Sequence, residues 1–160
     1  MLERKAYSSL LSWKTNHKSK CLMVKGARQV GKTYLVREFG RREYKSFIEI
    51  NFLKTPELKD IFSGDLSADN IYKRISANIR GVELIPGDTL IFLDEIQSCG
   101  NARTAVKFLA EDGRFDIIES GSLLGLSYAE DGDSDVEEPS SVPVAHEKNF
   151  YHNIFAFTKR

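Results

Sequence analysis

The chain has 160 residues, of which 41% are hydrophobic and 29% are charged. This is about one domain of ordinary globular composition, which excludes a wholly disordered chain, a collagen and a disulfide scaffold. The 23 basic and 23 acidic side chains give a formal net charge of zero, so bulk charge does not support nucleic-acid binding.

The sequence also gives expectations about location. Cys21 and Cys99 are the only cysteines and lie near predicted strands, so we expect reduced thiols in a cytoplasmic protein. No apolar run approaches the roughly 18 residues that span a bilayer, and the polar start of the chain predicts no signal peptide and no membrane partner.

The first half of the chain alternates helix and strand patterns. Apolar residues at helical spacing predict a helix over 2–15. A short, non-alternating apolar run predicts a strand over 21–24 that is buried on both faces. A second helix is expected from Lys32 to about Phe39, with Arg41 and Arg42 at its end, and a second strand over 47–52.

The second half continues this alternation. We expect a helix capped by Ser67 and closed by Gly81, and then a turn over 86–88. Residues 89–93 give the strongest strand signal, followed by a helix capped by Asn101 and a fourth strand over 115–118. Strands that alternate with helices predict an α/β fold with a parallel sheet.

Residues Gly26 to Thr33 match G-x-x-x-x-G-K-[ST], the pattern of a loop that binds phosphate groups, which we call the phosphate loop. The glycines let backbone N–H groups approach the anion, and the following helix directs its positive dipole end toward it. Lys32 would contact the β- and γ-phosphates, and Thr33 would offer a hydroxyl to Mg²⁺. A chance match is disfavoured because the loop joins a predicted strand to a predicted helix. The expected nucleotide contacts are Gly26, Ala27, Arg28, Gln29, Val30, Gly31, Lys32, Thr33 and Tyr34.

The strand over 89–93 ends in two carboxylates, Asp94 and Glu95. A parallel strand beside the phosphate loop would bring its carboxyl end next to Mg²⁺. We expect Asp94 to hold the metal through water and Glu95 to accept a proton from the attacking water. A solvated strand end is the alternative, which the upstream phosphate loop disfavours.

The fourth predicted strand is followed by Glu119-Ser120-Gly121-Ser122. Ser120 lies near the strand end and could reach the γ-phosphate or the attacking water. A plain turn rich in Ser and Gly remains the alternative.

Three segments together, GARQVGKT, LIFLDEIQ and ESGSLLG, resemble the bacterial and archaeal AAA-type P-loop ATPases that carry a C-terminal domain of unknown function. The resemblance covers about residues 1–144. It implies a three-layer α/β/α P-loop NTPase fold with a parallel sheet of four to five strands, in which one additional strand separates the catalytic-Glu strand from the phosphate-loop strand. It also implies ATP and Mg²⁺ binding and ATP hydrolysis, with Lys32, Glu95 and the γ-phosphate sensor Ser120 as catalytic residues.

The last part of the chain departs from this family. We expect an ATP-binding domain over 1–126, an acidic linker or loop over 127–144 and an atypical tail over 145–160. Val136 and Val142 occupy positions where a calcium-binding EF-hand loop needs Gly and Glu, which disfavours that site. Similar proteins continue for a few hundred residues, so a truncated or frame-shifted product would look like this.

That departure affects the sheet. We expect the fifth strand to be missing or replaced, which leaves residues 21–25 as an edge strand. We also expect residues from about Ser127 onward to be poorly ordered and dispensable for nucleotide binding. The alternative is that aromatic residues of the tail cover this edge.

Four further features remain open. Arg28 could contact phosphate or a neighbouring subunit, and Gln97 could position water or signal the nucleotide state, but surface roles fit both residues equally well. The three histidines have no metal-ligand spacing, so no zinc site is expected. An arginine finger would come from self-association or from another domain.

Two functions follow from these features. The first is Mg²⁺-dependent ATP hydrolysis. The second is a nucleotide-binding remnant or interaction module of a longer ATPase, without hydrolysis.

Overall fold

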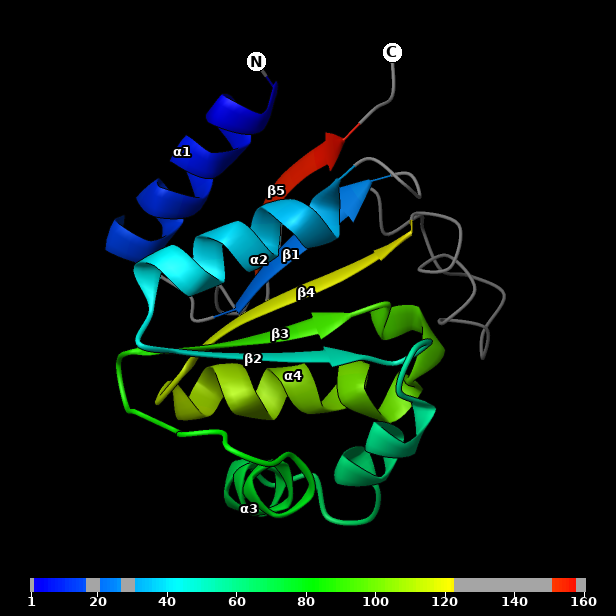
Figure 1. Cartoon of the computed structure of the whole chain (residues 1–160). Helices are drawn as coiled ribbons and strands as arrows, with labels where there is room; N and C mark the ends of the chain where they lie inside the picture. Colours follow the sequence, from blue (N-terminus) through cyan, green and yellow to red (C-terminus); the bar gives the residue numbers. More distant parts are fainter. Residues whose placement is uncertain (1, 17–20, 27–30, 123–150, 158–160) are drawn as a thin grey trace.

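Strands and helices alternate along the chain, as predicted. The computed structural model describes residues 2–16, 21–26, 31–122 and 151–157 (Figure 1). Its elements are α1 (Leu2–Asn16), β1 (Cys21–Gly26), α2 (Lys32–Glu43), β2 (Ser46–Asn51), the 3₁₀ helix η1 (Pro56–Phe62), α3 (Ala68–Asn78), β3 (Thr89–Asp94), the 3₁₀ helix η2 (Ile96–Ser98), α4 (Gly100–Asp112), β4 (Asp116–Ser122) and β5 (Tyr151–Phe157).

The strands form one sheet in the order β2-β3-β4-β1-β5. Every pairing is parallel, so the carboxyl ends of the strands lie along one edge. Because β4 lies between β1 and β3, one strand separates the strand that ends in Asp94 from the phosphate-loop strand. The predicted α/β class and the additional-strand topology are therefore confirmed.

Helices cover both faces of the sheet and divide the core in two (Figure 1). Side chains of α1 and α2, such as Leu10 and Phe39, pack on one face against Leu22, Phe92 and Ile118. The opposite face packs against η1, α3 and α4. Each large side chain that is fully buried stabilises the fold by about 1.5–3 kcal/mol.

Helix α2 is longer than the sequence predicted. The expected end near Phe39 is wrong, because the helix continues to Glu43. Gly40 is a packing residue and not a stop signal: a Cβ at this position would lie 2.3 Å from Phe47 Cδ2. The missing side chain therefore lets α2 lie directly on β2.

The predicted helix caps have different outcomes. Ser67 is the N-cap residue of α3, as predicted, although its side chain makes no cap bond, and the helix ends at Asn78, before Gly81. Asn101 lies inside α4, whose N-cap residue is Cys99. Capping residues are weak signals in isolation, because a neighbouring loop can offer the same side chain a different partner.

The last two strands in the chain, β4 and β5, differ most from the sequence predictions. Strand β4 runs to Ser122, so the segment that could have been a turn belongs to the strand. Strand β5 pairs with β1 on the side opposite β4. The expectation that residues 21–25 form an edge strand is therefore wrong. Residues 151–157, which were expected to be poorly ordered, form β5. The other residues from Ser127 onward, 127–150 and 158–160, lie outside the described residues.

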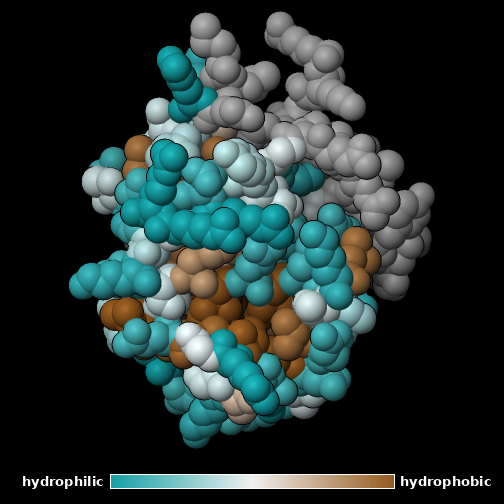
Figure 2. Space-filling model, viewed as in Figure 1, coloured by the Kyte–Doolittle hydropathy of each residue, from teal (hydrophilic) through white to brown (hydrophobic). Residues whose placement is uncertain are grey.

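The surface of the described part is mixed in character. Hydrophobic side chains gather in the middle of the face shown in Figure 2, and hydrophilic side chains surround them. Within the ranges that the structure describes, no helix is long and apolar enough to cross a membrane.

Candidate active site

The phosphate loop connects β1 to α2. Strand β1 ends at Gly26, and α2 begins at Lys32. Gly31 has φ 82°, a left-handed conformation that suits glycine and turns the chain into the helix. The predicted contacts of Ala27, Arg28, Gln29 and Val30 lie outside the described residues.

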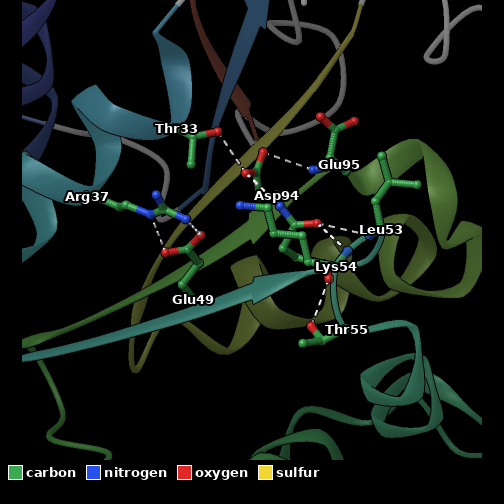
Figure 3. Close-up of polar contacts among 9 residues, drawn as sticks. Thr33, Arg37, Glu49, Leu53, Lys54, Thr55, Asp94 and Glu95 are labelled. Atoms are coloured by element: carbon green, nitrogen blue, oxygen red, sulfur yellow. Dashed lines mark hydrogen bonds and ion pairs between the residues drawn. The ribbon is translucent and has the colours of Figure 1, made fainter. Parts of the chain in front are cut away.

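Thr33 and Asp94 point toward each other from α2 and β3 (Figure 3). The Thr33 hydroxyl donates a hydrogen bond of 2.8 Å to Asp94 Oδ2. Asp94 is almost fully buried at 2% exposure, and burial raises the pKa of its carboxyl, although the bond from Thr33 acts in the opposite direction. The structure thus brings together the two residues that the sequence assigned to Mg²⁺.

Lys32 lies at the start of α2, with 8% of its surface exposed. Burial lowers the pKa of its ammonium group, whereas the negative charges of Glu95 and Asp94 raise it. Lys32 is therefore a largely desolvated cation near two carboxylates, where charge interactions are stronger than in bulk water.

Glu95 follows β3 in an unusual backbone conformation. Its φ of 57° is the only positive φ of a non-glycine residue in the part of the chain that the structure describes. Its N–H donates to Asp94 Oδ1 at 3.0 Å, and its carboxylate accepts a hydrogen bond of 2.5 Å from Gln97 Nε2. Left-handed non-glycine residues cost free energy and often occur at functional sites.

Ser120 lies opposite Asp94 in the parallel pairing of β4 with β3. The residue is fully buried, and its Oγ has no hydrogen-bond partner among the described residues. A buried hydroxyl without a partner is uncommon and needs an explanation, such as a water or a ligand group. Ser120 thus lies beside Asp94, on the neighbouring strand.

Tyr34 lines a cavity of about 440 Å³ between α1 and α2. The tyrosine is 63% exposed. Arg4, Tyr7, Ser8, Leu35, Glu38 and Arg42 form the other described walls of this cavity. Two aromatic rings and two guanidinium groups thus line this cavity. One of the rings belongs to Tyr34, which directly follows Thr33 in the sequence.

The donor set is compatible with a hard cation. Thr33 and Asp94 offer hydroxyl and carboxylate oxygens, which are the ligand types that Mg²⁺ prefers. Within the described ranges, no group of three or more His, Cys, Asp or Glu side chains is arranged to hold a metal. A metal held by these two residues would therefore need further oxygen ligands from phosphate or water.

Sequence reasoning missed Asn51, the last residue of β2. Its Nδ2 donates to Asp94 Oδ2 at 3.2 Å, and its Oδ1 accepts the N–H groups of Leu53 and Lys54. The available signal was a polar residue at the end of an apolar strand, at the edge that also carries Asp94.

A bidentate ion pair was also missed. Arg37 of α2 binds both carboxylate oxygens of Glu49 on β2, at 2.7 Å each (Figure 3). This pair fixes α2 against β2. No local pattern in the sequence could have paired a helix residue with that strand residue.

Two of three comparisons with known proteins found a match. A family model described as an AAA domain matches residues 18–143. Among solved structures, PCH-2 of C. elegans is similar, with a TM-score of 0.51 and 13% sequence identity. The match covers 97% of this chain and 43% of the PCH-2 chain, and at this identity it supports the fold alone. No curated protein sequence matches the chain.

Proposed function

The chain belongs to the AAA domain family, and on that premise we propose that it binds ATP with Mg²⁺ and hydrolyses the γ-phosphate bond. The observation that supports this most directly is the convergence of Lys32, Thr33, Asp94 and Glu95 at one edge of the sheet. Membership of the family implies a nucleotide-binding domain. Hydrolysis, the metal and the residue roles are our proposal.

The proposed mechanism assigns one task to each residue. Lys32 contacts the β- and γ-phosphates, and the N–H groups of the phosphate loop hold the phosphate chain. Glu95 accepts the proton of the attacking water, and Ser120 contacts the γ-phosphate or that water. Thr33 and Asp94 would hold Mg²⁺, which when bound neutralises charge on the phosphate oxygens.

Asp94 and Glu95 have separate roles in this proposal. Asp94 already accepts hydrogen bonds from Thr33, Asn51 and the backbone of Glu95, so its oxygens are fixed in place. Glu95 is less buried and is held by one side chain, Gln97. A fixed carboxylate suits metal binding, and a more accessible one suits proton transfer.

We place the nucleotide base in the cavity between α1 and α2. The cavity is adjacent to the phosphate-loop helix, and Tyr34 and Tyr7 offer ring surfaces for a planar base. The preference for ATP over GTP rests on the family resemblance. Titration of the protein with each nucleotide measures this preference.

Partners and location complete the proposal. An arginine finger would come from a second copy of the chain or from another domain. Cys21 and Cys99 are both buried and form no disulfide with each other, and this is the basis on which we propose a reducing, cytoplasmic location.

Replacement of Lys32 tests nucleotide binding. Lys32→Ala should weaken ATP binding by about 1.5–3 kcal/mol, because a charge-assisted contact is lost. The control is Lys73→Ala on the exposed surface of α3, which should leave the affinity unchanged. Equal affinity of the Lys32 variant and the wild type would contradict the assignment of the phosphate site.

Replacement of Glu95 separates binding from turnover. Glu95→Gln keeps the size of the side chain but removes the base, so ATP should still bind while hydrolysis falls by roughly 10²–10⁴-fold. Glu111→Gln, on the exposed side of α4, is the matched control. If the wild type binds ATP without any turnover, the chain is a non-hydrolysing nucleotide-binding module, which is the second function that the sequence allowed.

A further inference from the structure

Gln97 links the proposed catalytic base to a neighbouring strand. Its Nε2 donates to Glu95 Oε2 at 2.5 Å, and its other amide atom, Oε1, faces Gly121 of β4. We propose that Gln97 is a positioning residue that sets the place of the Glu95 carboxylate, and that Gly121 in turn sets the place of Gln97. This inference rests on the proposed role of Glu95.

The contact with Gly121 is unusually close. A Cβ on this residue would lie 2.5 Å from Gln97 Oε1 and 3.5 Å from Gln97 Cδ. Real Cβ atoms do not approach oxygen so closely, so any other residue at position 121 would push the amide away. The absence of a side chain on Gly121 therefore leaves the space that the Gln97 amide occupies.

The amide oxygen and the turn that carries Gln97 are both in contact with the core. Gln97 Oε1 is buried and has no hydrogen-bond partner among the described residues. Gln97 also belongs to η2, a short turn closed by hydrogen bonds from Ser98 N–H to the Glu95 carbonyl and from Cys99 N–H to the Ile96 carbonyl. Because the side chain of Ile96 is fully buried, the turn that carries Gln97 is anchored in the core.

This arrangement connects the end of β4, which carries Ser120, with the carboxylate of Glu95. Gly121 directly follows Ser120, which lies opposite Asp94. Successive side chains of a strand point to opposite faces, so β4 meets the phosphate-loop side through Ser120 and the Gln97 side through Gly121. A displacement of the end of β4 at Ser120 would therefore reach Glu95 through Gln97.

Turnover measurements test the link. Gly121→Ala and Gln97→Ala should each lower kcat by about 10–100-fold, since small misplacements of reacting groups have effects of this size. Affinity for ATP should stay within about threefold of the wild type, because neither residue belongs to the phosphate loop. Gly100→Ala is the matched control: a Cβ there meets nothing within 4 Å.

A double-mutant cycle separates this role from general damage. In the Gln97→Ala background the clash is gone, so Gly121→Ala should cause no further loss of kcat. If Gly121→Ala alone fails to fold, recovery of folding in the double variant supports the same contact. Losses that simply multiply in the double variant would overturn the proposal.

A measurement without turnover keeps the inference distinct from the proposed function. In nucleotide-free protein, the NMR signal of the Gln97 side-chain amide can be identified by its loss in Gln97→Ala. Glu95→Ala and Gly121→Ala should both shift this signal, and Gly100→Ala should not. An absence of wild-type hydrolysis would contradict the proposed function, whereas an unshifted amide signal in the first two variants would overturn the positioning role.

Discussion

At the residue scale, two buried carboxyl groups on neighbouring strands differ in their hydrogen bonds. Asp94 accepts hydrogen bonds from Thr33 and Asn51. Glu119, opposite Leu93 in the pairing of β4 with β3, is fully buried, and neither of its oxygens has a hydrogen-bond partner among the described residues. Burial raises the pKa of Glu119 to about 7, although the positive charges of Arg103 and Lys25 act in the opposite direction.

The raised pKa of Glu119 predicts a dependence of stability on pH. The folded protein keeps the proton up to about pH 7, while the unfolded chain releases it near the ordinary value of 4.5. The stabilising contribution of the protonated form is therefore complete below pH 4.5 and is lost as the pH rises through 7, with a total of roughly 3 kcal/mol. Glu119→Gln should remove this part of the pH dependence.

Urea denaturation at pH 5 and pH 8 measures the effect. The wild type should lose more unfolding free energy between these pH values than the Glu119→Gln variant does. Glu111→Gln, at an exposed position of α4, serves as the control. A wild type and a Glu119 variant with parallel pH profiles would contradict the prediction.

At the scale of elements, the contact between α2 and β2 depends on one glycine and one ring. Gly40 packs against Phe47, whose ring stacks on Phe92 with 6.4 Å between the ring centroids. The ring cannot move away from the helix without disturbing this stack. The Arg37–Glu49 ion pair then holds the same helix and strand together near the surface.

Gly40→Ala should therefore destabilise the protein, although alanine favours helices. The added methyl would overlap the Phe47 ring, and overpacking of this kind costs about 1–3 kcal/mol. The higher helix propensity of alanine offsets at most about 1 kcal/mol of this destabilisation. The unfolding midpoint in urea should fall for Gly40→Ala and stay unchanged for Gly100→Ala. An increase in the midpoint for the Gly40 variant would show that the ring repacks without cost.

Elements that carry a dense local signal could be predicted from the sequence. Nearby residues are enough to predict the helix that begins at Leu2, the strand that ends in Asp94 and the helix start at Lys32. Asn101 was misread as a cap because the role of an asparagine depends on what packs against it. Strand β5 was expected only in the alternative in which aromatic residues of the tail cover the edge beside β1, since the two strands lie far apart along the chain.

In the candidate site, too, some residues could be predicted from the sequence and others could not. The sequence placed Thr33 and Asp94 in one metal site, and the structure brings their side chains together. Asn51 and Gln97 reach the same edge through tertiary contacts that no spacing rule describes. The assigned roles of Lys32, Glu95 and Ser120 remain predictions.

At the scale of the whole molecule, β5 gives β1 a partner on each side. β1 pairs with β4 on one side and with β5 on the other. The strand that leads into the phosphate loop is therefore an interior strand, and β2 and β5 are the edges of the sheet. Interior strands are protected from pairing with other chains.

Removal of β5 should expose the strand that carries the phosphate loop. A chain that ends at residue 150 should unfold at lower urea concentration, associate at high concentration and bind ATP more weakly than the full chain. A chain that ends at residue 157 keeps β5 and is the control. Equal stability of the two shortened chains would show that β1 does not need β5.

The position of β1 in the sheet also affects how the chain acquires its fold during synthesis. Both strands that flank β1 are translated long after it, and β5 is the last strand of the sheet to be made. In the nascent chain, β1 therefore has no sheet partner until β4 has been synthesised. Contacts between distant segments slow folding and leave apolar strands exposed to wrong pairing. We expect the newly made chain to need protection by a chaperone until β5 has emerged, so that the ability to bind nucleotide appears only late in translation.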